Sequence, residues 1–284
     1  MSALLALLSS VLWGLSDFLG GTAARRMPTP AVVGASQLVG LLTLTPVAVA
    51  TGALDTPRSY LLPAAAAGAV GISALAMFYR ALAVGTMGVV APIAALGVSV
   101  PVVVGLARGE HPSTLQLLGI VVAVAGVVLA SGPELSGRGS GGATALLLAL
   151  GSAVGFGLVL LLVAEGSKGD SGSVVMTLLT MRLTGIGLLT ALLLATVRRR
   201  GWVIQVTRRD LPVLGVLGIA DVAANGTYAI ASRSSLVSVA SVLASLYPVV
   251  TALLAFRVHG ERMTRVQLAG VAISLTGVVL LAGG

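Results

Sequence analysis

The stretch GEHPSTLQLLGIVVAVAGVVL, Gly109 to Leu129, returns near the C-terminus as GERMTRVQLAGVAISLTGVVL, Gly260 to Leu280. The offset is 151 residues, and the alignment needs no gap. Nine of the 21 aligned positions are identical: Gly109/Gly260, Glu110/Glu261, Gln116/Gln267, Leu117/Leu268, Gly119/Gly270, Gly126/Gly277, Val127/Val278, Val128/Val279 and Leu129/Leu280. Apolar segments resemble one another by composition alone, so the shared Gly-Glu pair, the glutamine and the inner glycines carry the weight. The repeat indicates duplication of a half-length unit.

The composition of the chain is that of a membrane protein. Of its 284 residues 57% are hydrophobic and only 9% are charged, and the mean hydropathy is +1.07, whereas a soluble domain carries about 25% charged residues. A chain this apolar cannot cover its surface in water, so its solvent must be lipid. The apolar runs are about 20 residues long and continuous, as helices require, and not about 10 and alternating, as barrel strands require. We therefore predict an all-α integral membrane protein.

Charge and reactive side chains exclude several classes of function. The net charge is +8, but the basic residues sit in short loops between apolar runs, so we expect no nucleic-acid partner. The chain has no cysteine, which excludes disulfides, thiolate metal sites and cysteine nucleophiles. Its two histidines, His111 and His259, lie in different loops without a partner at metal-ligand spacing. We expect neither a metal nor a cofactor.

Ten apolar segments follow one another along the chain, each long enough to cross a hydrocarbon core of about 30 Å. They cover residues 2–22, 31–52, 60–83, 87–107, 114–132, 143–165, 173–197, 211–231, 236–256 and 265–282. The Gly/Ser-rich stretch GPELSGRGSGG, which ends at Gly142, is typical of a flexible linker. It predicts a five-helix repeat at 1–132, a linker at 133–142 and a second five-helix repeat at 143–284. Because five is odd, the ten transmembrane helices would form two inverted five-helix repeats, a recurring plan in secondary transporters.

The repeated stretch itself has a structural interpretation. Each copy begins with the pattern S/T-x-x-Q of a capping box, formed by Ser113 with Gln116 and by Thr264 with Gln267. Such a cap satisfies backbone N–H groups where a span enters the membrane and water becomes scarce. The glycines that follow allow close helix packing; they are Gly119, Gly126, Gly270 and Gly277. We expect Glu110 and Glu261 to support the same turn from the loop.

The distribution of basic residues bears on orientation. Loops after odd-numbered spans carry 12 Lys and Arg residues, and loops after even-numbered spans carry 4. Taken alone, this bias predicts that the odd-numbered loops lie in the cytoplasm and that both termini lie outside.

Four ionisable residues fall within the predicted spans, where each must find a partner or water. They are Asp17, Arg80, Arg182 and Asp221. Asp17 and Arg80 fall at similar depths of spans one and three, and Arg182 and Asp221 fall near the middle of antiparallel spans seven and eight, so two pairs are plausible. Such pairs would hold helices in register, or Asp17 and Arg80 would extend to the interface. Alternatively, these residues face a water-filled cavity, where an Arg binds an anionic group and an Asp takes up a coupling proton.

Aromatic and polar residues at related positions of the two halves could wall a central cavity, or simply pack and anchor the helices. The candidates for the substrate cavity are Trp13, Tyr79, Phe156, Asn225, Tyr228 and Tyr247. We expect this cavity to be lined by spans one, three, six and eight. Pro248 aligns with Gly97, so we also expect kinks in spans nine and four, where transporters expose backbone groups to substrate.

The order of these motifs resembles the EamA family of the drug/metabolite transporter superfamily. The resemblance rests on the Trp13-Gly14 pair, SDFLGG at Ser16 to Gly21, and FYRALAVGTMGVVAPIAAL running into GExxSxxQLxGxxxxxxGVVL. It covers residues 1–132 and 143–283, once per half. It implies ten helices, inverted repeats, a central cavity and secondary export of metabolites such as amino acids, or of drugs, often coupled to protons. The family has no universal set of substrate-binding residues to carry over.

The chain departs from the family pattern in two respects. Family members commonly carry Pro where this chain has Gly97, and here Pro101 follows one turn later, which predicts a displaced kink. Family members usually have both termini in the cytoplasm, against the Lys/Arg count, so the orientation stays open.

These observations favour a secondary transporter over two alternatives. Its partners would be a small-molecule substrate, protons and the lipid bilayer. We expect the protein to be a monomer or a homodimer and to lie in the cell membrane, as in the inner membrane of a bacterium. A polytopic enzyme acting on lipid would need a catalytic cluster, and the sequence offers no His pair, no Cys and no paired carboxylates along a helix. A channel or structural subunit would not require an inverted duplication.

Overall fold

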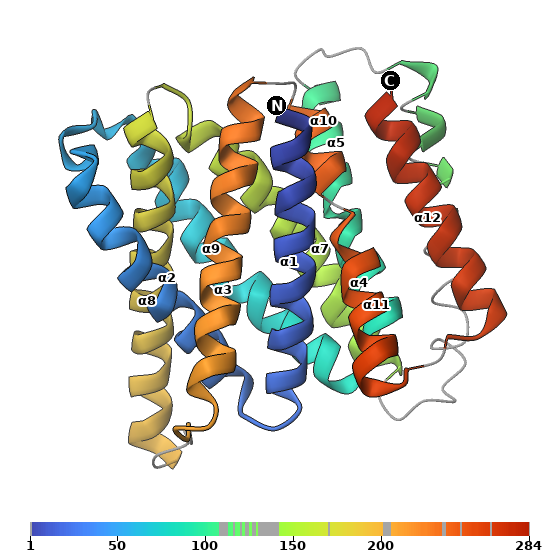
Figure 1. Ribbon diagram of the computed structural model, residues 1–284, viewed down its shortest axis with the longest axis horizontal. Helices are drawn as coiled ribbons and strands as arrows, with labels where there is room; N and C mark the ends of the chain where they lie inside the picture. The colour runs from blue at the N-terminus through green and yellow to red at the C-terminus, as the bar shows by residue number, and fades with distance from the viewer. Residues whose placement is uncertain are drawn as a thin grey trace.

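The fold is known from a computed structural model (Figure 1). It describes residues 2–283 apart from 108–112, 116, 120, 123–124, 127–128, 130–141, 170, 201–205, 235–236, 245 and 262. Helices and the turns between them account for all of the described residues, without a strand among them. This confirms the prediction of an all-α chain.

The helices follow the apolar segments closely. They are α1 (Ser2–Ala24), α2 (Thr29–Ala50), α3 (Leu61–Val84), α4 (Met87–Ala95), α5 (Ser99–Ala107), α7 (Gly142–Gly166), α8 (Ser171–Arg200), α9 (Leu211–Ser234), α10 (Val237–Ala244), α11 (Tyr247–His259) and α12 (Arg265–Gly283). Three short 3₁₀ turns accompany them: η1 (Ala53–Asp55), η2 (Arg58–Tyr60) and η3 (Leu96–Val98). The described residues among 114–129 are helical as well.

Six of the described helical segments are long and apolar enough to cross a membrane by themselves: Leu4–Ala24, Thr29–Ala50, Arg58–Val84, Gly142–Gly166, Ser173–Ala195 and Leu211–Arg233. The fourth and ninth predicted spans are divided. A 3₁₀ turn, η3, separates α4 from α5, and a break before Tyr247 separates α10 from α11. The expected irregularities in spans four and nine are therefore present.

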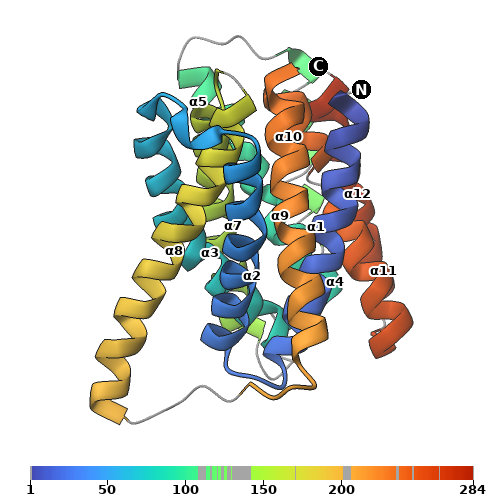
Figure 2. The same cartoon turned by 60° about the vertical axis from the view of Figure 1, so that its left-hand side comes forward.

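The two halves of the chain start at opposite ends of the bundle. At the end of α1, Arg25 forms an ion pair with Glu261, and Glu261 also accepts a hydrogen bond from the backbone N–H of Met87. Just before Met87, Gly85 lies against Ala145 in the first turn of α7. The start of α7 thus lies where α1 finishes, while both chain termini lie together at the other end (Figures 1 and 2).

The second copy of the repeated stretch forms the expected capping box. The backbone N–H of Thr264 donates to Oε1 of Gln267 at 2.9 Å, and the N–H of Gln267 donates to Oγ1 of Thr264 at 3.2 Å. In the first copy, Gln116 and Glu110 lie outside the described residues. We expected Glu261 to support its own turn. Its carboxylate instead contacts Arg25 and the N-terminus of α4.

The two copies also pack against each other. A Cβ atom placed on Gly126 would lie 2.2 Å from the backbone nitrogen of Ser274 and 2.7 Å from the carbonyl oxygen of Gly270. Only a glycine permits this approach between the helical residues around 126 and α12. The packing role predicted for these glycines is therefore confirmed for Gly126.

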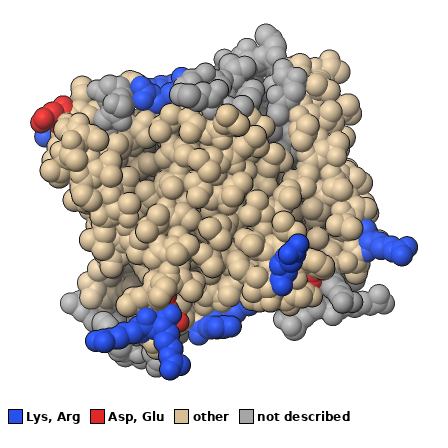
Figure 3. Space-filling view, viewed as in Figure 1, with Lys and Arg blue, Asp and Glu red and all other residues tan. Residues whose placement is uncertain are grey.

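The outer surface suits a lipid environment. Large apolar side chains point outward along the bundle, among them Leu62 (81% exposed), Leu4 (71%) and Leu147 (70%). On the face shown in Figure 3, a broad central area carries no charged side chain, and the charged residues lie near its upper edge, in its lower part and at its right-hand edge. More of the basic side chains on this face lie at the margin away from the termini (Figures 1 and 3), in line with the bias counted from the sequence.

Candidate functional site

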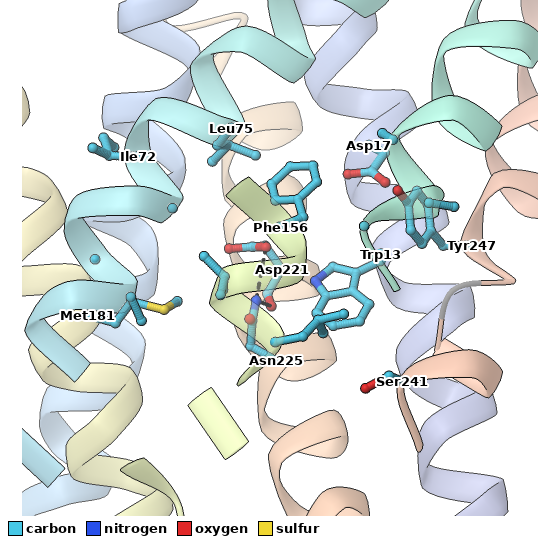
Figure 4. A pocket seen from close by; sticks show the side chains of 18 of the residues that line it. Trp13, Asp17, Ile72, Leu75, Phe156, Met181, Asp221, Asn225, Ser241 and Tyr247 are labelled. Atoms are coloured by element: carbon cyan, nitrogen blue, oxygen red, sulfur yellow. Dashed lines mark hydrogen bonds between the residues drawn. The ribbon is translucent and has the colours of Figure 1, made fainter. Parts of the chain in front are cut away.

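A cavity of about 100 Å³ lies inside the bundle, between the first and the second half of the chain. This volume is enough for several water molecules, since one water needs about 10–15 Å³ by the same measure. The cavity is lined by Trp13, Asp17, Gln37, Ala67, Gly68, Gly71, Ile72, Leu75, Ala94, Ala95, Gly97, Val98, Phe156, Val159, Leu160, Met181, Arg182, Asp221, Asn225, Ser241 and Tyr247. Figure 4 shows the labelled members of this set around the space that they enclose.

More helices build this cavity than the sequence indicated. We expected spans one, three, six and eight, which are α1, α3, α7 and α9. The second, fourth, seventh and ninth spans contribute too, through Gln37, Gly97, Arg182, Ser241 and Tyr247. Both halves of the chain therefore supply four spans each to the same wall.

An ion pair crosses the cavity wall between α8 and α9. Nη2 of Arg182 lies 2.6 Å from Oδ2 of Asp221, although the angles are not those of a hydrogen bond. Nη1 of Arg182 donates to Oε1 of Gln37 on α2 at 3.0 Å. Asn225, one turn after Asp221, donates to Oδ1 of that carboxylate at 3.1 Å. The pair suggested by the depths of Arg182 and Asp221 is thus formed, and two amides hold it in place.

Room for the guanidinium of Arg182 comes from a glycine. A Cβ atom on Gly40 of α2 would lie 3.0 Å from Nε of Arg182 and 3.2 Å from its Cδ. Arg182 is only 2% exposed, so its charge is held within the protein and compensated there by Asp221. A buried ion pair of this kind needs such close support, because removing two charges from water is costly.

Asp17 stands apart from this pair. Its side chain lines the cavity and is 7% exposed. Among the described residues, none forms a hydrogen bond or an ion pair with the side chain of Asp17. In Figure 4 its carboxylate lies beside the phenol ring of Tyr247, and the indole of Trp13 lies below them. The site therefore holds one carboxylate whose charge is not balanced by a basic neighbour in contact.

The break in the fourth span lies at Gly97 itself. A Cβ atom on Gly97 would lie 2.3 Å from the carbonyl oxygen of Ala153, and one on Gly157 would lie 2.2 Å from the carbonyl oxygen of Gly97. The two glycines let η3 and α7 meet backbone to backbone. Pro101 has no N–H to donate to the carbonyl of Gly97, which frees that turn from α-helical geometry. We expected the kink to be displaced to Pro101. The irregular turn is instead centred on Gly97.

Three of the candidate residues do not line the cavity. Tyr79 is fully buried, and its ring lies on Gly20 of α1, where a Cβ atom would come within 2.3 Å of it. Tyr228 lies behind the wall, with its hydroxyl 3.0 Å from Oγ of Ser241 and its ring 5.8 Å from that of Trp13. Arg80 is exposed and makes no ion pair with Asp17, so the suggested Asp17–Arg80 pair is not formed.

The other candidates come together. Trp13, Phe156, Asn225 and Tyr247 line the cavity along with Asp17, Arg182 and Asp221. Gln37 and Ser241 were missed by sequence reasoning, although both also line it. The polar amide of Gln37 inside an apolar span was a signal that could have been followed, because a lone amide there needs a partner. Ser241 gave no such signal, since serines are frequent in these spans.

Contacts between the halves also lie at the end of the bundle where α1 finishes. The hydroxyl of Thr22 lies 2.7 Å from Nε2 of His259, whose ring lies 5.2 Å from that of Phe18. The Arg25–Glu261 ion pair lies next to them. The last turn of α1 is in this way joined to the end of α11 and to the loop that follows. We call Thr22, Arg25, His259 and Glu261 the end cluster.

The site is a small, largely apolar cavity with a few polar side chains, enclosed between two halves of an apolar bundle. The sequence model of the EamA-like transporter family matches residues 1–132 and, a second time, residues 143–283. The chain belongs to the EamA-like transporter family. This membership agrees with the drug/metabolite transporter superfamily, and it makes this a multi-pass membrane protein of a family whose members are transporters.

Two further comparisons frame this EamA-like chain. No curated protein sequence matches it significantly. A solved crystal structure resembles it with a TM-score of 0.69, over 99% of this chain and 96% of the other, at 16% sequence identity. At that identity the likeness shows a shared fold. It covers the whole EamA-like chain and not one half alone.

Proposed function

We propose that this EamA-like chain is a secondary transporter that exports a small organic solute by alternating access through the cavity. Its units are the repeats 1–132 and 143–284, joined by the linker 133–142, as ten transmembrane helices in two inverted sets of five. The opposite starts of α1 and α7 support the inversion. The observation that carries the proposal is the cavity itself, which four spans from each half enclose.

The interrupted helices explain how such a cavity could change its exposure. The fourth and ninth spans are divided at equivalent places, at η3 and before α11, and each break lies beside the cavity. Broken helices at membrane depth are tolerated where they line a cavity, and they let one half of a span move without the other. Rocking of the two halves would then open the end cluster on one side and close the other side.

We further propose that transport is coupled to protons and that the protein lies in the cell membrane of a bacterium. Asp17 and Asp221 are the candidates for proton uptake, because both carboxylates line the cavity. Asp221 already has Arg182 as its partner at 2.6 Å. Asp17 has no basic partner in contact among the described residues, so Asp17 is the stronger candidate for a group that changes its protonation during the cycle.

Flux in proteoliposomes tests this proposal. The purified protein is reconstituted with a pH-sensitive dye inside the vesicles, and proton movement is recorded when candidate solutes are added to the outside. We expect a saturable, solute-dependent proton flux in the wild type, a lost flux in Asp17→Asn, and an unchanged flux in Asp55→Asn, which removes an exposed carboxylate outside the cavity. Flux that rises linearly with solute would indicate a channel. An unchanged flux in both Asp17→Asn and Asp221→Asn would disprove the coupling assignment.

A further inference from the structure

The charges that line the cavity do not balance. Three lining residues carry a carboxylate or a guanidinium: Asp17, Arg182 and Asp221. The guanidinium of Arg182 is paired with Asp221 and also bonded to Gln37. With all three side chains ionised, the formal charge of the wall is therefore −1, and it resides on Asp17. A buried carboxylate without a cation is unfavourable, so the site favours a ligand that brings a positive charge.

Aromatic rings surround the same carboxylate. Trp13, Tyr247 and Phe156 line the cavity, and Figure 4 shows them around the space into which Asp17 points. The rings of Trp13 and Tyr247 lie 6.5 Å apart at an angle of 73°. Faces of Trp and Tyr attract an ammonium group at up to about 6 Å, and more strongly where water is excluded. The carboxylate and the rings thus attract the same kind of group.

Apart from Gln37, Asn225 and Ser241, the rest of the wall is apolar and small. Those three polar side chains are already hydrogen-bonded within the protein. Ile72, Leu75 and Met181 face the cavity together with alanines and glycines of α3 and α4. They offer contact to an alkyl body and no hydrogen bond to a second polar group. The volume of about 100 Å³ has room for a short alkyl body.

We propose that the cavity binds a small organic monocation, a primary ammonium group on a short apolar body, with the ammonium held between Asp17, Trp13 and Tyr247. This proposal rests on the proposed function and specifies the substrate class of the same site. An amine differs from an amino acid only in lacking the carboxylate. A carboxylate would need a free cationic partner, and Arg182, the one basic side chain among the described lining residues, is already engaged by Asp221 and Gln37.

The consequence for coupling is direct. Asp17 can hold either the ammonium group or a proton, because both neutralise the same carboxylate. Entry of a proton then displaces the cation and release of the proton readmits it, so export of the amine is linked to proton entry without a second site.

Three matched compounds test the substrate class. They are 3-methylbutylamine, leucine, which carries the same ammonium and alkyl groups plus a carboxylate, and 3-methylbutanol, which has the same body without charge. Binding to the detergent-purified protein is measured by calorimetry and by the shift in melting temperature. We expect 3-methylbutylamine to bind and to raise the melting temperature, and leucine and the alcohol to bind at least about tenfold more weakly, a difference of about 1.4 kcal/mol.

Variants locate the ammonium group. Asp17→Asn should weaken binding of 3-methylbutylamine about tenfold or more and Trp13→Leu by several-fold, whereas Asp55→Asn should leave it unchanged. Asp17→Glu keeps the charge, so it should retain binding if Asp17→Asn fails only through loss of the carboxylate. The melting temperature of each variant without ligand shows whether it is folded.

The outcomes separate this proposal from the proposed function. Tighter binding of leucine than of the amine, or amine binding that is unchanged in a folded Asp17→Asn, overturns the monocation site. If the amine binds through Asp17 but never crosses the proteoliposome membrane, the site stands and the transport proposal fails. If a solute is transported while the amine does not bind, transport stands and the substrate class is wrong.

Discussion

Nη2 of Arg182 and Oδ2 of Asp221 lie 2.6 Å apart inside the bundle, where they join α8 to α9. Because Arg182 is 2% exposed and Asp221 is 7% exposed, water compensates either charge far less well than its partner does. The pair therefore acts as a unit, held by Gln37 on one side and by Asn225 on the other.

Removing one member of this pair should destabilise the protein more than removing both. Arg182→Met leaves the carboxylate of Asp221 buried without a cation, at a cost of about 3–5 kcal/mol. In Arg182→Met/Asp221→Asn neither charge remains, so the double variant should melt at a higher temperature than Arg182→Met alone. Melting temperatures in one detergent, combined as a double-mutant cycle, measure the coupling. Strictly additive effects of the two substitutions would show that the pair does not act as a unit.

The backbone contact between η3 and α7 should make Gly97 intolerant of any side chain. In Gly97→Ala the new Cβ would lie 2.3 Å from the carbonyl oxygen of Ala153, so one of the two segments must move. We expect a loss of about 1–3 kcal/mol. Gly187→Ala on α8 is the matched control, because a Cβ there meets nothing within 4 Å and alanine favours the helix by about 0.5–1 kcal/mol. Similar melting temperatures for the two variants would contradict the close contact.

The positions of the spans could be predicted from the sequence, but the rotation of each helix could not. Hydropathy and the 151-residue repeat locate the helices, and counting along the segments places Arg182 and Asp221 at one depth. Depth does not fix direction, as Arg80 and Asp17 demonstrate: both lie within spans, yet only Asp17 faces inward. In water an apolar stripe marks the inner face of a helix, but a helix in lipid is apolar on all sides.

The same reason explains the two tyrosines. We expected Tyr79 and Tyr228 in the cavity because they lie at related positions of the two halves, yet Tyr79 packs on Gly20 and Tyr228 lies behind Trp13. Close contacts made by glycines decide such rotations. They depend on the partner helix, which no local pattern in the sequence reveals.

The capping box at the start of α12 should contribute measurably to stability. Thr264→Ala removes the hydroxyl that accepts from the N–H of Gln267 at 3.2 Å, and we expect a loss of about 1 kcal/mol. Thr264→Ser retains an accepting hydroxyl and should behave as the wild type. Thermal unfolding of the three proteins compares them. Equal stability of Thr264→Ala and Thr264→Ser would mean that water replaces the cap.

The end cluster should weaken as the pH falls. Partial burial of His259, together with the charges of Arg25 and Arg26, lowers its pKa from the ordinary 6.5, although Glu261 acts in the opposite direction. A lowered pKa means that the closed contact favours neutral His259. The contact is therefore fully present above a pH of about 6.5 and loses strength as the pH falls below it, where the opened histidine binds a proton first.

Distances between spin labels can test this pH dependence, because the chain has no native cysteine. Cysteines at Pro30 and Phe256, both exposed, carry labels on either side of the end cluster. We expect the distribution of label distances to shift to larger values at pH 5.5 than at pH 7.5, and His259→Gln to abolish the shift because glutamine does not titrate. If the His259→Gln variant keeps the full shift, the pH dependence belongs to another group. If the doubly labelled protein that retains His259 shows the same distance distribution at both pH values, protonation does not open this end.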